Sequence, residues 1–407
     1  MNAWFTPAIL QRARQLDIYA DKALADHLWP RLPAHMNFLQ KLRIEAFERN
    51  EILALPQPLL DLPAVTSLHL QGYHVPWRSA LMSPQLTELD IGYWFPSRPL
   101  PYEVLRDMLS SLQFLERLIL CGINVRFSTP FDQIPNIVLS LHLMKLEIHT
   151  EVEQGDISTN NLMLMSLLQT PPGCNRLVSI QRETGETAPL EGILARLIPL
   201  FSLVNYKEMG LRQLWLEEHA MTFASTPMML QDSTVAHQSS YNRTAARLDL
   251  APSLDAYPLN LYLPFVPVGR LRTLFLDGWT TRTLSSHNLW PELLRAEEVW
   301  DVKLTSATEG HDYATFFDVL RNERLGGDSN SHSAMLFPRM EQLALPLSGV
   351  ETASTDVIAD LIKLIHARQH KGAPIKKLLV PKEVEHWISW DTLRTMMNVT
   401  TVIDGQY

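Results

Sequence analysis

One spacing of aliphatic residues recurs through this chain and limits the folds open to it. The segment LRTLFLDGW, residues 271–279, places leucines at LxxLxL spacing. The same spacing returns in LQKLRI, VTSLHL, LTELDI, LERLIL and LRQLWL. In a β-strand, successive side chains alternate between two faces, so Leu274 and Leu276 point into a common core, and Leu271 enters it from the preceding turn. Each segment therefore predicts a short strand with one buried aliphatic face.

The central leucine of each segment sets a register. The clear register leucines are Leu42, Leu68, Leu89, Leu118, Leu146, Leu214, Leu274, Leu343 and Leu378, with weaker positions near Leu248, Val302 and Val402. Early intervals match leucine-rich repeats, which run at about 20–29 residues. The wide interval after Leu146 predicts a degenerate repeat around Leu177–Glu183. Because one unit cannot bury its leucines alone, many units must stack into a continuous core and a parallel sheet.

Helical periodicity fills several of the connections. Apolar residues between Val104 and Leu112 have helical spacing and precede the strand segment at Leu115. A second helix is expected to begin at Ser354 or Thr355. Its predicted buried stripe is Val357, Ile358, Leu361, Ile362 and Ile365, its last turn is basic (His366, Arg368, His370, Lys371), and Gly372 and Pro374 end it.

The pattern predicts a single α/β domain over residues 1–407. We expect a leucine-rich-repeat solenoid of about 11–13 irregular repeats, with a parallel β-sheet on the concave face and helices and irregular loops on the convex face. Polar stretches near 223–244 and 324–333 lack an apolar period and are expected to be loop insertions.

Composition narrows the class of partner. Hydrophobic residues make up 46% of the chain, enough for a large core. The net charge of −9, without a clustered run of Lys and Arg, argues against a nucleic-acid partner. No apolar run of about 18 residues and no basic leader occur, so no membrane partner is expected. Two cysteines, Cys121 and Cys174, suit a reducing compartment, and we predict a cytoplasmic or nuclear location.

Motifs for catalysis and metal binding are missing from the sequence. GxSxG, GxxxxGK, HExxH and a strand-linked GxGxxG do not occur. His366 and His370 have helical spacing, but no third ligand is apparent nearby, and Glu217–His219 lacks a second histidine. We therefore predict no enzyme activity, no catalytic residue, no cofactor and no metal.

The outward positions of the strands form the candidate binding surface. Lys41, Arg43, His69, Glu88 and Asp90 belong to it by spacing. As candidate protein-binding residues we single out Arg117, Lys145, Glu147, Gln213, Trp215, Glu217, Arg247, Asp249, Phe275 and Asp277. Large aromatic residues on a polar face are often contact anchors. Two alternatives remain for Trp215 and Phe275: they anchor a partner, or a loop of this chain covers them.

The repeat segments resemble those of fungal F-box/leucine-rich-repeat proteins. The similar segments are PWRSALMSPQLTELDI (Pro76–Ile91), LRDMLSSLQFLERLILCG (Leu105–Gly122), LPFVPVGRLRTLFLDG (Leu263–Gly278), LFPRMEQLAL (Leu336–Leu345), LIKLIHARQHKGAPIKKLLV (Leu361–Val380) and the opening ILQRARQLDIYAD (Ile9–Asp21). The resemblance implies a non-catalytic protein–protein interaction module, similar to the substrate-recognition repeats of an F-box ubiquitin-ligase adaptor.

The sequence departs from this family in one respect. We find no F-box segment in this chain, so a cullin-ligase adaptor is an expected partner only if an F-box lies upstream of it. Otherwise the expected partner is a protein of unknown identity. The alternative functions are a repeat-only structural scaffold, a decaying paralogue, and an enzyme with its site in the loops.

Overall fold

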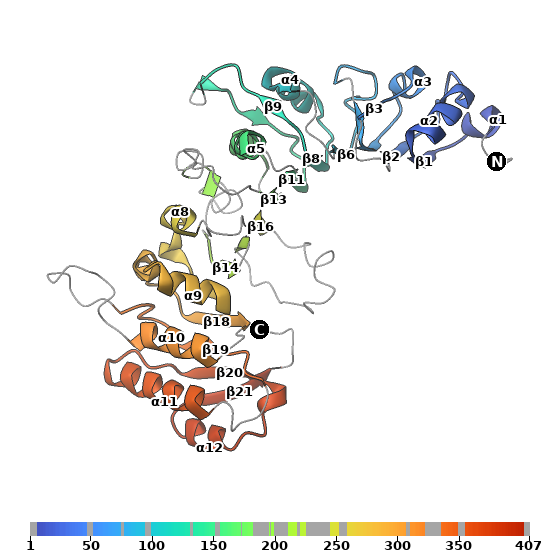
Figure 1. Cartoon of the computed structure of the whole chain (residues 1–407). Helices are drawn as coiled ribbons and strands as arrows, with labels where there is room; N and C mark the ends of the chain where they lie inside the picture. The colour runs from blue at the N-terminus through green and yellow to red at the C-terminus, as the bar shows by residue number, and fades with distance from the viewer. Residues whose placement is uncertain are drawn as a thin grey trace. The chain divides into compact units, whose positions relative to one another are not determined.

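A computed structural model describes residues 6–46, 52–74, 77–93, 99–130, 133–150, 155–171, 173–181, 195, 197–198, 211–217, 220–224, 245–251, 259–306, 310–321, 335–348 and 355–402. The chain forms two compact units. Unit 1 comprises Met1–Leu197 and Leu248–Ala256, and unit 2 comprises Ile198–Arg247 and Tyr257–Tyr407 (Figure 1). Strand β16 (Ala245–Ala251) contributes residues to both. A single domain over residues 1–407 stays a prediction.

Unit 1 is built on a parallel sheet whose strand order follows the chain. Its seven strands are β1 (Gln15–Ala20), β2 (Lys41–Ala46), β4 (Ser67–Gln71), β6 (Glu88–Gly92), β8 (Arg117–Cys121), β11 (Lys145–Thr150) and β13 (Asn175–Gln181). Every neighbouring pair is parallel. The α/β class and the parallel sheet that the sequence predicts are confirmed here.

The register leucines form one buried column across this sheet. Leu42, Leu68, Leu89, Leu118 and Leu146 are paired in register, and each is at most 1% exposed. A second column follows two residues later, made of Ile18, Ile44, Leu70, Ile91, Leu120 and Ile148. Burying one such side chain stabilises a fold by about 1.5–3 kcal/mol. The two columns therefore contribute a large part of the hydrophobic stabilisation of unit 1.

The seventh strand carries an arginine where the others carry leucine. Residue 146 pairs with Arg176, so the strand occupies Asn175–Gln181 and starts before the segment predicted around Leu177–Glu183. Arg176 is 5% exposed, its Nε donates to Thr170 Oγ1 at 2.8 Å, and burial lowers its pKa to about 10. The hydroxyl satisfies a buried donor, which is why a charged residue is tolerated in the column.

Short helices and small strand pairs connect the strands of unit 1. The helices are α1 (Pro7–Leu10), α2 (Lys22–Leu28), η1 (Trp29–Arg31), α3 (Gln57–Leu60), α4 (Tyr102–Ser111) and α5 (Gly155–Leu167). The small parallel pairs are β3 (Leu53–Ala54) with β5 (Tyr73–His74), β7 (Leu100–Pro101) with β9 (Val125–Arg126), and β10 (Ile137–Val138) with β12 (Leu168–Gln169). Helix α4 confirms the helical spacing read before Leu115, with Leu105, Met108 and Leu109 buried.

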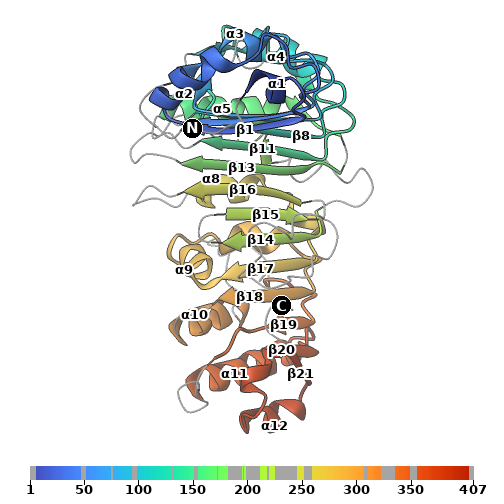
Figure 2. The ribbon, with the colours of Figure 1, turned by 90° about the vertical axis from the view of Figure 1, so that its right-hand side faces the viewer.

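Unit 2 contributes seven sheet strands, one of which is reversed. Their order is β15 (Ala220–Ala224), β14 (Gln213–Glu217), β17 (Thr273–Asp277), β18 (Asp301–Ser306), β19 (Gln342–Ala344), β20 (Lys377–Pro381) and β21 (Asn398–Val402). Strand β15 is antiparallel to β14, and the arrows of Figure 2 point in opposite directions, whereas the pairs from β14 to β21 are parallel. A connection of two residues, 218–219, is too short for a parallel crossover and makes a hairpin.

The reversed strand also revises two sequence expectations. Phe223 and Ala224 begin the predicted insertion 223–244 but belong to β15, while residues 225–244 and the predicted insertion 324–333 lie outside the described residues. At the end of the sheet, Leu378 pairs with Val399, so Val399 and not Val402 holds the register position.

The helices of unit 2 follow the strands of its sheet. They are α8 (Leu259–Tyr262), η4 (Leu263–Phe265), η5 (Val268–Arg270), α9 (Gly278–Ser286), η6 (Trp290–Arg295), α10 (Gly310–Arg321), α11 (Thr355–His370), η8 (Lys382–Val384) and α12 (Ser389–Arg394). Helix α10 packs against both α9 and α11. Helix α11 has the predicted start, and Gly372 takes the predicted left-handed conformation, with φ +75°.

One basic residue in the last turn of α11 is buried. The sequence places Arg368 in a basic last turn that complements the negative end of the helix, and the structure buries its side chain fully. Its guanidinium donates to the backbone carbonyls of Leu336, Phe337 and Ala373 at 3.1, 2.7 and 3.2 Å, and burial lowers its pKa to about 10. Arg368 therefore ties the end of α11 to the chain that leads into β19.

Candidate functional site

The outward side of the unit 1 sheet carries a set of polar residues that we call the polar sheet face. It consists of Gln15, Asp17, Tyr19, Lys41, Arg43, Glu45, Ser67, His69, Gln71, Glu88, Asp90, Arg117, Lys145, Glu147 and His149. All are half-buried or exposed, in alternation with the buried columns. The strands position them, because neighbouring residues must face opposite sides of the sheet. Lys41, Arg43, His69, Glu88, Asp90, Arg117, Lys145 and Glu147 lie where the sequence predicts.

A chain of ion pairs crosses three strands of this face. Arg43 contacts Glu45 at 2.5 Å, Glu45 Oε1 lies 2.9 Å from His69 Nε2, and His69 Nδ1 lies 2.8 Å from Asp90 Oδ2. The Glu45 contact with His69 has ion-pair distance without hydrogen-bond geometry, so we take the Asp90 contact as the better-formed one. Arg43 also lies 5.3 Å above the ring of Tyr19. Register therefore brings these charges together laterally.

Strand β11 contributes a second cluster. Lys145 Nζ lies 2.7 Å from Glu147 Oε1, and His149 Nε2 lies 3.5 Å from Glu147 Oε2. Burial by itself raises the pKa of Glu147, but hydrogen bonds from His149 and Lys145, with their attraction, outweigh it and lower the pKa to about 2. Glu147 is thus held as a carboxylate.

Two cations of the face have no partner. The side chains of Lys41 and Arg117 make no ion pair or hydrogen bond with any of the described residues. Both line a shallow hollow of about 180 Å³, together with Ser67, His69 and Glu88. Ser67 Oγ donates to Glu88 Oε2 at 2.7 Å, which leaves that carboxylate engaged. The hollow therefore offers two cationic groups to an incoming acceptor.

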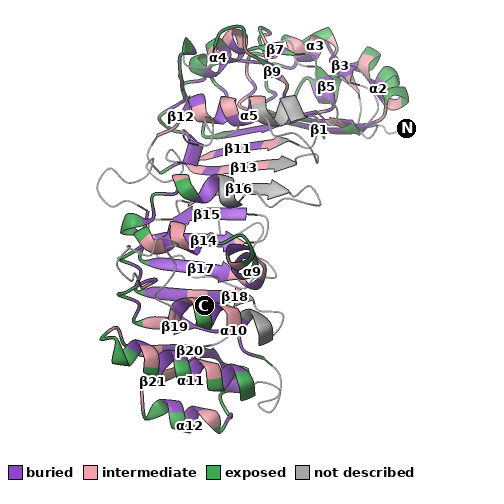
Figure 3. Ribbon diagram, turned by 60° about the vertical axis from the view of Figure 1, so that its left-hand side comes forward, coloured by how far each residue is buried: buried purple, intermediate pink, exposed green. Residues whose placement is uncertain are grey.

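On the corresponding side of unit 2, three strands, β14, β15 and β17, have buried outward side chains. Trp215 and Phe275 stack at 4.2 Å between ring centroids and 9° between planes, with Ala224 beside them, and they are 4% and 1% exposed. Figure 3 shows β14, β15 and β17 in the buried colour over most of their length. Of the two alternatives for these rings, burial agrees with packing inside this chain.

Polar side chains near these two rings are also largely withdrawn from water. Asp301 is 4% exposed, and burial raises its pKa although Lys303 and a hydrogen bond from Gln342 act in the opposite direction. Lys303 Nζ lies 5.1 Å from the centre of the Phe275 ring. Gln213, another predicted contact residue, is 8% exposed.

The remaining predicted residues have local contacts. Asp277 caps α9, its Oδ1 accepting from the Thr280 amide at 2.6 Å. Arg247 pairs with Glu217 at 3.1 Å. The side chain of Asp249 lies outside the part of the molecule that is described. Neither of these two contacts by itself points to a binding site.

Sequence reasoning missed several members of the polar sheet face. Strand β1 has Leu16 and Ile18 in alternation but no third leucine, so its Asp17 and Tyr19 were not assigned to the face. Glu45 and His149 end their strands beyond the LxxLxL segment. The alternation of exposed and buried residues in QLDIYA is the signal that could have found β1.

The described residues hold no cluster with metal-binding geometry. Among them, no three His, Cys, Asp or Glu side chains are placed to bind one ion. Cys121 and Cys174 are buried free thiols, and burial raises the pKa of Cys174 to about 11. Within the described ranges, no helix has both the length and the apolar character needed to cross a bilayer.

Comparison with known proteins adds no relative: the chain matches no protein-family model and no curated protein.

Proposed function

We propose that this chain is a leucine-rich-repeat solenoid that binds a protein partner through the polar sheet face and catalyses no reaction. The polar sheet face is the observation that carries the proposal. Parallel sheets are usually covered on both sides. In unit 1 one side holds the buried columns, whereas the other, apart from the buried Ile119 and Cys121 of β8, carries charged and polar side chains that are half-buried or exposed. A sheet face left uncovered by its own chain is a surface available to a partner.

The charges on the face favour a protein over a polyanion. Cations and carboxylates alternate across it, and most of them already pair with one another. A phosphate backbone prefers clustered Lys and Arg. A mixed-charge surface instead selects a complementary protein surface and sets its orientation. Lys41 and Arg117 are the contacts we expect to be made first by acceptor groups of that partner.

The resemblance to fungal F-box/leucine-rich-repeat proteins supports a protein as the partner. On that basis we propose substrate recognition for ubiquitin ligation, with a cullin-ligase adaptor as a further partner only of a product that carries an F-box. A cytoplasmic or nuclear location is part of the same proposal.

Charge reversal tests the surface. The chain carrying Arg117→Glu is compared with the wild type and with Arg126→Glu, which makes the same charge change at an exposed position of β9. Proteins captured from cells are quantified by mass spectrometry. We expect a partner whose recovery falls about tenfold with Arg117→Glu, equivalent to about 1.4 kcal/mol of binding free energy, and not with Arg126→Glu.

A photo-crosslinking group at position 88, against one at position 107 on α4, gives a second readout. Adduct formation at position 88 alone supports the proposal. Identical recoveries for all three chains and no adduct at position 88 would leave the scaffold reading or a loop-based enzyme as the better account.

A further inference from the structure

The starts of the strands in unit 2 form a regular backbone ladder. The carbonyl of Arg272 accepts from the amides of Trp300 and Asp301 at 3.0 and 3.1 Å, and the carbonyl of Trp300 accepts from Glu341 and Gln342 at 2.9 Å each. The carbonyl of Glu341 continues the ladder to Lys376 at 2.8 Å. Four side chains from distant parts of the sequence are therefore held about 4.8 Å apart, one per strand.

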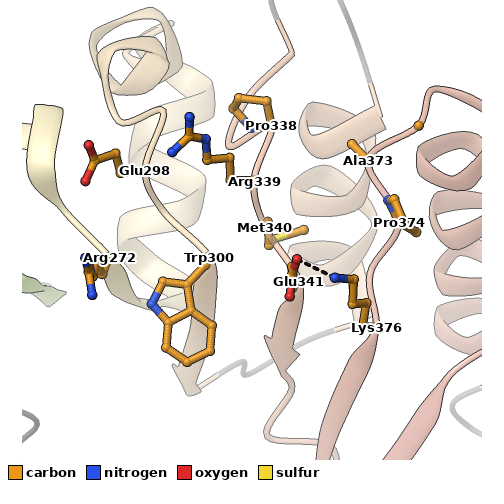
Figure 4. A pocket seen from close by; sticks show the side chains of 11 residues that line it. Arg272, Glu298, Trp300, Pro338, Arg339, Met340, Glu341, Ala373, Pro374 and Lys376 are labelled. Atoms are coloured by element: carbon orange, nitrogen blue, oxygen red, sulfur yellow. Dashed lines mark hydrogen bonds and ion pairs between the residues drawn. The ribbon is translucent and has the colours of Figure 1, made fainter.

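These side chains line a hollow that we call the edge pocket. It has a volume of about 660 Å³ and is formed by Arg272, Glu298, Trp300, Arg339, Glu341 and Lys376, with Pro338 and Pro374 at its rim (Figure 4). Pockets that bind ligands or peptide side chains commonly measure about 300–1,000 Å³. All of its lining residues belong to unit 2.

The edge pocket contains an aromatic ring left in water. Trp300 is 43% exposed, and among the tryptophans that the structure describes it is the only one in an exposed position. Figure 4 shows its ring projecting from the edge between Arg272 and Glu341. An exposed tryptophan leaves a large apolar area to be buried on binding, and this residue type is enriched in the energetic centres of interfaces.

The charges of the pocket are unevenly satisfied. Lys376 Nζ pairs with Glu341 Oε1 at 2.6 Å, so these two neutralise each other. The guanidinium groups of Arg272 and Arg339 make no ion pair or hydrogen bond with any residue in the described ranges. Arginine presents a planar fork of donors that fits a carboxylate with two parallel hydrogen bonds.

We propose that the edge pocket binds an acidic peptide segment of another protein. An apolar side chain of the segment packs on Trp300, and carboxylates of the segment accept hydrogen bonds from Arg272 and Arg339. This goes beyond the proposed function, because it concerns another surface, in the other unit, and fixes the chemistry of the occupant.

The pocket suits a peptide better than a nucleic acid. Single-stranded nucleic acids usually stack on several aromatic rings along a basic groove, whereas this pocket offers one ring.

Peptide selection tests the inference. Random peptides displayed on phage are selected on the full chain, and the recovered peptides are measured by fluorescence anisotropy. We expect selected sequences rich in Asp and Glu beside an aromatic or aliphatic residue. Trp300→Ala and the double variant Arg272→Glu, Arg339→Glu should each weaken their binding about tenfold or more.

Two matched variants serve as controls. Ile388→Ala removes an apolar side chain that is 76% exposed, and Lys382→Glu reverses an exposed cation, both in unit 2 and outside the pocket. Neither should change peptide affinity, and circular dichroism should show that all variants fold. Arg117→Glu should also leave peptide binding unchanged, so a failure of the proposed function and a failure of this inference give different results.

Three outcomes would overturn the inference. The first is selected peptides without acidic enrichment, or with affinities insensitive to Trp300→Ala. The second is tighter binding of a single-stranded oligonucleotide than of the selected peptides. The third is self-association, seen by analytical ultracentrifugation and lost with Trp300→Ala, which would assign the pocket to a second copy of this chain.

Discussion

The two units share a backbone arrangement but differ in the side chains on the outward face and at the strand starts. In unit 1 the outward side of the sheet is wet and charged, and the residues at the strand starts are Gln40, Thr66, Thr87 and Glu116, joined by the same carbonyl ladder. In unit 2 the outward side is buried at β14, β15 and β17, and the corresponding ladder carries Arg272, Trp300, Glu341 and Lys376. The buried columns are alike in both.

The difference shows which positions are fixed by folding. The column positions are aliphatic in both units, with Arg176 as the exception in unit 1, because they supply the burial that holds the strands together. Outward and strand-start positions carry no such constraint. They therefore differ between the units, and surfaces for other molecules can form there.

Removing an outward ring should have its largest effect in unit 2. Phe275→Ala is expected to lower the free energy of unfolding by about 3–5 kcal/mol, because the ring is 1% exposed and stacks on Trp215. Tyr19→Ala, at a 42% exposed outward position of unit 1, should cost less than about 1 kcal/mol. Urea unfolding followed by circular dichroism measures both. Equal costs would contradict the contrast between the buried outward side of β14, β15 and β17 and the solvent-exposed outward side of the unit 1 sheet.

Because both units have buried aliphatic columns, a leucine-to-alanine substitution in either column should lower stability by a similar amount. Leu118→Ala in unit 1 and Leu274→Ala in unit 2 should each cost about 2–5 kcal/mol, since both side chains are fully buried at register positions. Leu141→Ala, at an 83% exposed position, serves as the control and should stay within about 0.5 kcal/mol of the wild type. A column leucine that costs no more than the control would show that its unit is held together by other contacts.

Lowering the pH should change the free energy of unfolding in opposite directions through Glu147 and Asp301. The pKa of Glu147 is lowered from 4.5 to about 2, so its contribution is present above pH 4.5 and is lost as the pH falls toward 2. Glu147→Gln should cost about 1–3 kcal/mol at pH 7 and nothing near pH 2.

Asp301 provides the opposite case. Burial raises its pKa, so the folded chain keeps its proton longer, and stability attributable to this group declines as the pH rises above its ordinary value of 3.8. The stability of Asp301→Asn relative to the wild type should therefore increase with pH. Unfolding measured from pH 2 to 7 checks both variants, and parallel pH dependences for the two would contradict the assignment.

The smallest expected change in the free energy of unfolding is that of Trp300→Ala, which contrasts the exposed ring of Trp300 with the packed ring of Trp215. Trp300→Ala should change the free energy of unfolding by less than about 1 kcal/mol, because nearly half of the side chain is already in water. Trp215→Ala, at 4% exposure, should cost about 3–5 kcal/mol. A large loss of stability from Trp300→Ala would mean that the edge pocket is part of the packing of unit 2.

The periodic part of the fold could be predicted from sequence. The LxxLxL spacing located β2, β4, β6, β8 and β11, and helical spacing located α4 and α11. It missed β1, the reversal of β15 and the two buried arginines. Arg176 and Arg368 are tolerated inside only because oxygen atoms of other segments meet their donors, and a linear pattern does not contain those partners.

The candidate site was predictable only along each strand. Alternation placed Arg117, Lys145 and Glu147 on the outward side, but the lateral chain from Glu45 through His69 to Asp90 depends on register between strands. Whether Trp215 and Phe275 were covered depended on the third dimension. The edge pocket was out of reach for the same reason, since its residues span positions 272 to 376.

The carbonyl ladder has a consequence for how such a chain can change over evolutionary time. Two amide contacts with one carbonyl of the preceding strand hold the starts of nine strands: β2, β4, β6, β8, β11, β17, β18, β19 and β20. Duplicating or deleting a complete strand-and-connection segment preserves that grip, whereas inserting one residue within a strand turns its leucines outward. Such an array can therefore gain or lose whole strand-and-connection segments, and the side chains at the strand starts can change without breaking these hydrogen bonds.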